Sequence, residues 1–147
     1  MLRLFAVLVG CNYEGSGRAD LPVLLGAEND ARRMAALLAG QPLANGTLAR
    51  LTLLLGAEAT TANIQDALAT ATTAQTPDDT LLFYFAGHGH RDDAAGLTLY
   101  TWDGDLPAGA LVAAFGPDPK PTSLVLDCCH AGAIAGSAGV PAAQLVP

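Results

Sequence analysis

Hydrophobic and polar positions follow two different patterns in alternating segments of the chain. Nearly continuous apolar runs predict buried strands at residues 2–10, 48–56, 80–87 and 122–129. Apolar residues that recur every three or four positions predict helices at about 27–40 and 60–73, with a weaker one at about 107–115. A shorter apolar stretch at 96–102 predicts a further strand or edge segment.

The order of these elements predicts an α/β fold. Strands that alternate with helices are typical of a mostly parallel sheet, and strands that are apolar throughout indicate helices on both faces. A length of 147 residues fits one domain. The tail after residue 130 carries no clear helix or strand signal, so we expect the chain to be part of a larger protein or the large piece of a cleaved one.

Composition narrows the class of protein. The net charge is −7, from 14 acidic and 7 basic residues, which disfavours nucleic-acid binding because no basic face is available. Apolar runs are only strand-length and the first residues lack a basic leader, so we expect neither a membrane span nor a signal peptide. Three cysteines without framework spacing favour a reduced, cytoplasmic protein.

Two of the predicted strands end in reactive side chains. The stretch "LLFYFAGHGH" delivers His88 between Gly87 and Gly89, and "LVLDCCHAG" delivers Cys129. Catalytic groups gather at the carboxyl ends of strands in open α/β sheets, and neighbouring strands lie only about 5 Å apart. If these two strands are neighbours, an imidazole and a thiol can meet there, which is the pair that a cysteine nucleophile needs.

Strand geometry separates the two adjacent cysteines. Side chains alternate along a strand, so Asp127 and Cys129 project to one face and Cys128 to the other. Cys129, at the end of the strand, is the candidate nucleophile, whereas Cys128 is expected to pack as a small apolar residue. His130 is expected to point elsewhere. Backbone amides at Gly89 and Cys129 are candidate donors to an oxyanion.

Two other kinds of site are weaker readings of the same residues. A zinc site would use Cys128, Cys129, His88 and His90, but adjacent cysteines chelate poorly and the chain has no C-x-x-C motif. A tyrosine-phosphatase loop requires an arginine six residues after the nucleophile, where this chain has Ala135.

The combined motifs resemble the caspase-like cysteine peptidases, specifically the metacaspase and orthocaspase branch. "YFAGHG" and, about forty residues later, "DCCHAG" are similar to the S-G-H-G and D-x-C-H-S-G strand ends of that family. The stretch "FAVLVGCNYEGSGRADLPVLLGAENDARRMAALL" resembles its opening strand, loop and helix, and the likeness covers about residues 3–136. It implies a three-layer caspase-like fold, with residues 1–147 as the large-subunit catalytic domain without the small-subunit segment.

The resemblance also assigns roles to residues. It implies a cysteine endopeptidase with His88 as general base and Cys129 as nucleophile, acting through a thioester acyl-enzyme. Asp30 and Asp127 would form the acidic pocket for the residue before the scissile bond, and Ala86 stands where the family usually has a pocket serine. Two carboxylates select a basic side chain, so we expect cleavage after Arg or Lys rather than after Asp.

The resemblance leaves activation and partners as expectations. No cofactor is required, although many relatives are activated by calcium, and Asp103 and Asp105 in "TWDGD" are the candidate ligands. The expected partners are protein or peptide substrates and the small-subunit segment of the same precursor. Ala131 replaces the serine that commonly follows Cys-His. The alternative function is a catalytically weak caspase-like scaffold or regulatory module.

Overall fold

A computed structural model shows a central parallel sheet, and it describes residues 2–44, 46–94, 96–118 and 120–129. Four strands lie in the order β2-β1-β3-β7, and all three pairings between neighbours are parallel. Their bounds are β1 Leu2–Gly10, β2 Gly46–Leu55, β3 Thr80–Ala86 and β7 Thr122–Asp127. The two strands with reactive ends, β3 and β7, are therefore neighbours, as the sequence analysis required.

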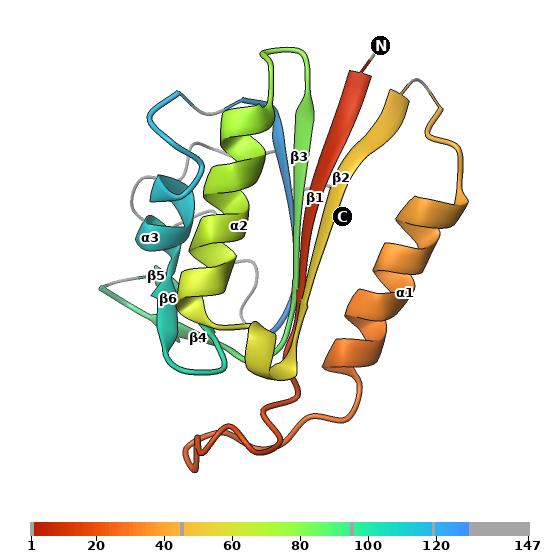
Figure 1. Cartoon of the computed structure of the whole chain (residues 1–147). Coiled ribbons are helices and arrows are strands. Elements are labelled where there is room, and N and C mark those ends of the chain that lie inside the picture. Colours follow the sequence, from red (N-terminus) through yellow and green to blue (C-terminus); the bar gives the residue numbers. More distant parts are fainter. Residues whose placement is uncertain (1, 45, 95, 119, 130–147) are drawn as a thin grey trace.

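Helices cover both faces of this sheet, which makes the three layers visible in Figure 1. Helix α1 (Ala27–Gly40) lies on one face, and α2 (Thr61–Ala74) and the short α3 (Ala108–Ala113) lie on the other. A 3₁₀ turn at Gly56–Glu58 leads into α2, whose first turn is capped because Thr60 Oγ1 accepts a hydrogen bond from Asn63 N at 3.1 Å. The predicted α/β class and three-layer arrangement are confirmed.

Alternation along the strands divides the core between the two faces. On β1, Ala6 and Leu8 pack towards α1, whereas Val7 and Val9 pack towards α2. All four side chains are buried, which explains why the strand has no polar positions along its buried part. Gly10 ends β1 beneath the first turn of α1, where an added Cβ would lie 2.7 Å from a backbone oxygen of the helix. The start of α1 is therefore held close to the carboxyl end of the sheet.

A second, antiparallel sheet follows β3, and the sequence pattern indicated only its middle strand. It has the order β4-β5-β6, with β4 at Gly89–Asp92, β5 at Gly96–Tyr100 and β6 at Asp105–Pro107. The outer strands are too short and too polar to give a periodic signal. No described helix is long and apolar enough to cross a membrane.

Candidate active site

The carboxyl ends of β3 and β7 bring the two motifs together. Ala86 pairs with Asp127 in the sheet register, and Gly87 N donates to Asp127 O at 3.2 Å. Beyond the last pair, a Cβ added to Gly89 would lie 2.8 Å from Cys129 O and 2.9 Å from Cys128 Sγ. The backbone of the Gly-His-Gly turn therefore lies directly against the backbone that carries both cysteines.

The two cysteines differ in their surroundings. Cys129 and Asp127 are exposed, whereas Cys128 is half-buried and packs against the core on the α2 side. Burial first, and then the negative charges of its neighbours Cys129 and Asp127, raise the pKa of the Cys128 thiol to about 11. The exposure of the two side chains therefore agrees with the prediction that Cys128 packs against the core and Cys129 does not.

The imidazole of His88 is oriented by a main-chain carbonyl. Its Nε2 lies 2.7 Å from the carbonyl oxygen of Pro22, in the loop between β1 and α1. A carbonyl can only accept a hydrogen bond, so Nε2 carries the hydrogen and, in the neutral ring, Nδ1 is left with its lone pair as the acceptor. Sequence reasoning missed Pro22, because nothing in its local pattern marks a residue that acts through its main-chain oxygen.

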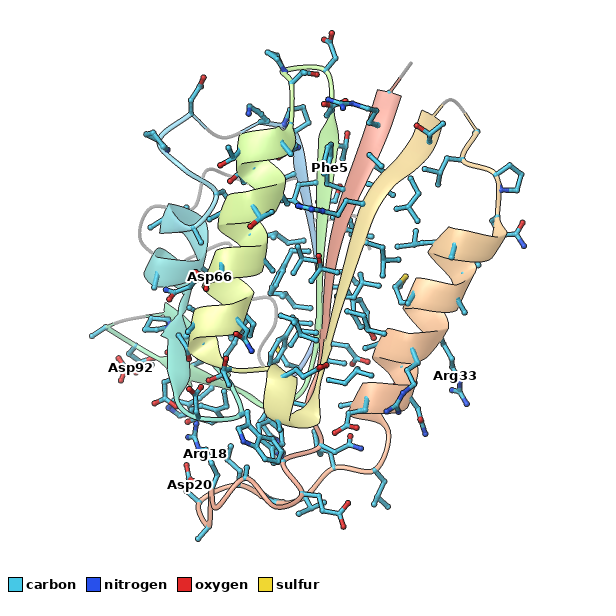
Figure 2. All side chains as sticks on the ribbon, in the orientation of Figure 1. Phe5, Arg18, Asp20, Arg33, Asp66 and Asp92 are labelled. Atoms are coloured by element: carbon cyan, nitrogen blue, oxygen red, sulfur yellow. The ribbon has the colours of Figure 1, made fainter. Side chains whose placement is uncertain are left out.

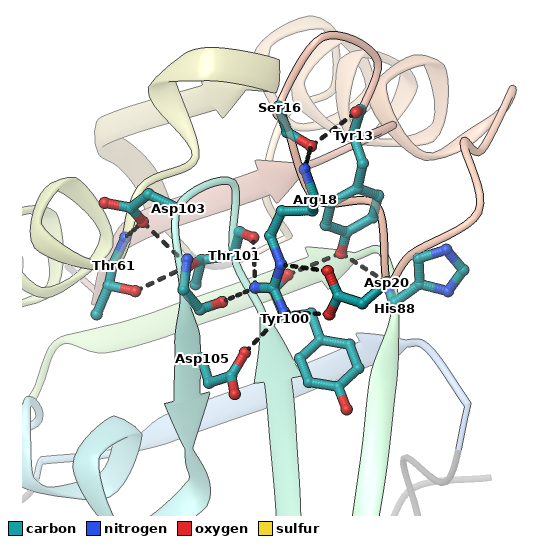
Figure 3. Close-up of polar contacts among 11 residues, drawn as sticks. Tyr13, Ser16, Arg18, Asp20, Thr61, His88, Tyr100, Thr101, Asp103 and Asp105 are labelled. Carbon is teal, nitrogen blue, oxygen red and sulfur yellow. Dashed lines mark hydrogen bonds and ion pairs between the residues drawn. The ribbon is translucent and has the colours of Figure 1, made fainter.

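Tyr13, in the same loop, also contacts His88, as Figure 3 shows. The two rings lie 5.0 Å apart at 30°. The hydroxyl of Tyr13 accepts from His88 N at 2.8 Å and donates to Tyr100 O at 2.7 Å. Burial raises the pKa of this hydroxyl well above its usual range, so it remains protonated and able to donate.

Both acids of the predicted pocket lie on the α1 side of the sheet. Tyr84 of β3 is 5% exposed on that face, and its pKa is raised by burial first and then by the negative charges of Asp127 and Asp30. Both carboxylates are therefore close enough to act on one hydroxyl. Ala86 is 1% exposed and belongs to the same buried cluster as Tyr84.

One of these acids has a basic partner in the structure. Asp30 Oδ1 lies 3.5 Å from Arg33 Nη1 on the next turn of α1, and the Arg33 side chain is 81% exposed. Figure 2 shows Arg33 extending away from the helix into solvent. Such an exposed ion pair stabilises by at most about 1 kcal/mol, so a basic ligand can displace it.

The calcium candidates make contacts within the protein. Asp103 Oδ1 accepts from Thr61 N at 2.9 Å, at the first turn of α2, and Asp105 Oδ1 accepts from Arg18 at 3.0 Å. Arg18 also pairs with Asp20 at 2.9 Å (Figures 2 and 3), and this hydrogen bond raises the pKa of the Arg18 guanidinium. Among the residues that the structure describes, no three acidic, cysteine or histidine side chains are grouped as metal ligands.

Some predicted features lie outside the described residues. These are His130, Ala131, Ala135 and the tail that ends at Pro147.

Comparison with known proteins assigns the family. The family profile described as the caspase domain matches residues 3–144. Protein GSU0716 from Geobacter sulfurreducens, a crystal structure, is similar with a TM-score of 0.67 and 26% sequence identity over 86% of this chain. The match covers 50% of that protein, so this chain spans about half its length. No curated protein matches. Because the family profile covers nearly the whole sequence, the chain belongs to the caspase-domain family of cysteine peptidases.

Proposed function

We propose that this chain is the catalytic part of a cysteine endopeptidase of the metacaspase or orthocaspase branch, with Cys129 as nucleophile and His88 as base. The observation that carries the proposal is the hydrogen bond from His88 Nε2 to Pro22 O, 2.7 Å long, at the strand end that touches the Cys129 backbone. It directs the basic nitrogen, Nδ1, away from Pro22 and leaves it available for a thiol proton.

The proposed reaction passes through a covalent intermediate. His88 Nδ1 takes the proton of Cys129, and the sulfur attacks the scissile carbonyl carbon. The backbone amides of Gly89 and Cys129 stabilise the oxyanion. The C–N bond then breaks, the leaving amine takes the proton from the imidazolium, and a thioester remains on the sulfur. Water, deprotonated by the same imidazole, hydrolyses the thioester and returns the thiol.

The proposed specificity is for Arg or Lys before the scissile bond. Support comes from the two carboxylates, Asp30 and Asp127, whose charges converge on Tyr84 at the carboxyl end of the sheet. Asp127 is exposed, and the ion-pair partner of Asp30 is a solvent-exposed arginine that a basic ligand can displace. A basic side chain gains charge-assisted hydrogen bonds there, whereas an acidic one is repelled. In the proposed pocket, Ala86 would supply a methyl group where the family usually has a serine hydroxyl.

We also propose a small-subunit partner, a calcium activator and a cellular compartment, each from a separate observation. The small-subunit segment of the precursor would add the next strand beside β7, which is the edge strand of the sheet as far as it is described. Calcium would act as an activator through Asp103 and Asp105, by replacing their contacts with Thr61 N and Arg18. The three free cysteines are consistent with a reducing, cytoplasmic compartment.

The test is hydrolysis of fluorogenic peptides by the full-length natural protein, with and without calcium. Peptides ending in Arg, Lys or Asp are compared for the wild type, Cys129→Ala and the neighbouring control Cys128→Ala. We expect turnover after Arg and Lys that Cys129→Ala abolishes and Cys128→Ala retains. Equal turnover after Asp would refute the pocket, and absence of all turnover would favour the scaffold function.

A further inference from the structure

Tyr13 has a backbone conformation that its side chain does not favour. Its φ is 65°, and it is the single non-glycine residue with positive φ in the described part of the chain. For an ordinary L-residue this conformation costs about 1–2 kcal/mol and persists where the surroundings require it, often at functional sites. Ser16 secures the bend, because its backbone N and its hydroxyl both donate to Tyr13 O, at 3.2 and 2.8 Å.

The bend delivers the Tyr13 side chain into the interior beside His88. Tyr13 is 2% exposed, although it belongs to a loop. Its hydroxyl accepts from His88 N at 2.8 Å and donates to Tyr100 O at 2.7 Å, so the oxygen bridges two backbone groups that are twelve residues apart in sequence. Figure 3 shows this bridge between the loop, the end of β3 and the end of β5.

The bridge completes the fixation of the His88 main chain. Tyr100 N donates to His88 O at 3.0 Å, so both backbone polar groups of His88 are bound to residue 100, one directly and one through the Tyr13 hydroxyl. The preceding Gly87 provides the space, because a Cβ there would lie 2.6 Å from the Tyr13 hydroxyl oxygen. These backbone hydrogen bonds do not restrict the side-chain torsions of His88.

The same loop also restricts those torsions. The Tyr13 ring packs against the imidazole at 5.0 Å, and Pro22 O holds Nε2 at 2.7 Å. Leu24 N donates to Asn12 O at 2.9 Å, which closes the loop on itself and fixes the spacing of Tyr13 and Pro22. The same loop therefore contacts the imidazole at its face, through Tyr13, and at Nε2, through Pro22 O.

We infer that Tyr13 is a positioning residue for His88, acting through the hydroxyl that bridges His88 N and Tyr100 O. The inference rests on the proposed peptidase function and deepens it. Tyr13 takes no part in bond making or breaking; it fixes the position of the His88 imidazole that accepts the thiol proton. Geometry errors of about 1 Å at a catalytic group can lower rates by about a hundredfold.

The test is Tyr13→Phe, which keeps the ring and removes only the bridging oxygen. Because His88 N and Tyr100 O then lose their partner, we expect kcat to fall about 10- to 100-fold while KM stays within about twofold. Rates are expressed per active site, counted by titration with an irreversible thiol inhibitor. The control is Thr122→Val at the amino end of β7, which removes another partly buried hydroxyl, one that donates to Lys120 O at 2.9 Å. It should leave kcat unchanged.

The outcomes separate this inference from the proposed function. An unchanged kcat per titrated site in Tyr13→Phe, or a rise in KM alone, would overturn the positioning role. If the wild type hydrolyses no peptide, the proposed function fails, and the alkylation rate of Cys129 by iodoacetamide still tests Tyr13: slower alkylation in Tyr13→Phe supports it, and an equal rate overturns it. If Tyr13→Phe does not fold, hydrogen exchange of the wild-type His88 amide decides. Strong protection supports the bridge, and exchange at the rate of an unstructured peptide overturns it.

Discussion

Gly89→Ala tests how closely the histidine turn and the cysteine strand must approach. The added Cβ would lie 2.8 Å from Cys129 O, 2.9 Å from Cys128 Sγ and 3.3 Å from Cys128 Cβ. The φ of Gly89 is outside the left-handed region, so alanine meets no backbone penalty there and the contacts alone decide the outcome. The backbone amide hydrogen of residue 89, the proposed oxyanion donor, is kept in this variant.

The size of the effect follows from these distances. Ordinary contact begins at 3.4 Å, so the turn and the Cys129 carbonyl must separate by about 0.6 Å. If a 1 Å displacement costs about a hundredfold in rate, this one should lower kcat/KM about tenfold. Overpacking of this kind also lowers the free energy of unfolding by about 1–3 kcal/mol.

The assay is kcat/KM on an Arg peptide, per titrated active site, together with urea unfolding. The matched control is Gly109→Ala in α3, where no atom lies within 4 Å of the added Cβ. That variant should keep full activity and gain about 0.5–1 kcal/mol, because glycine is unfavourable inside a helix. Wild-type kcat/KM in Gly89→Ala would refute the argument that this contact sets the separation of the two motifs.

Three further predictions concern stability and thiol reactivity. Arg3 holds the pKa of Asp79 below its usual range through a side-chain hydrogen bond, so this pair stabilises the fold fully above about pH 4 and progressively less as the pH falls further. Asp79→Asn should therefore lower the urea midpoint at neutral pH and weaken its decline in acid; an unchanged midpoint at both pH values would contradict this. Thr60→Ala removes the N-cap of α2 and should lower the free energy of unfolding by about 1 kcal/mol, measured by urea unfolding, and a loss under about 0.3 kcal/mol would show that the cap is redundant. Burial raises the pKa of both Cys11 and Cys128 to about 11, so native Cys129→Ala protein should react slowly with a thiol reagent near pH 8 and release both thiols in urea. Fast reaction of either thiol before unfolding would disprove that expectation.

The sequence determined the sheet and helices because their signals are local. Each strand of the large sheet is a run of apolar residues, and alternation places Ala6 and Leu8 on one face of the sheet and Val7 and Val9 on the other. The same alternation separated Cys129 from Cys128. The sequence left the adjacency of β3 and β7 as a condition, and the register Ala86–Asp127 shows that it is met.

Tertiary structure alone decided what surrounds the imidazole. Tyr13 and Pro22 are separated from His88 by 75 and 66 residues, and they act through a hydroxyl and a main-chain oxygen. The loop that carries them has no period, since its conformation depends on turns and on contacts with distant strands. The polar strands β4 and β6 also escaped the sequence pattern, being only four and three residues long. The periodic burial of helices and strands depends on residues that are close in sequence. The closure of a loop over a strand end depends instead on contacts that form only once the whole sheet has folded.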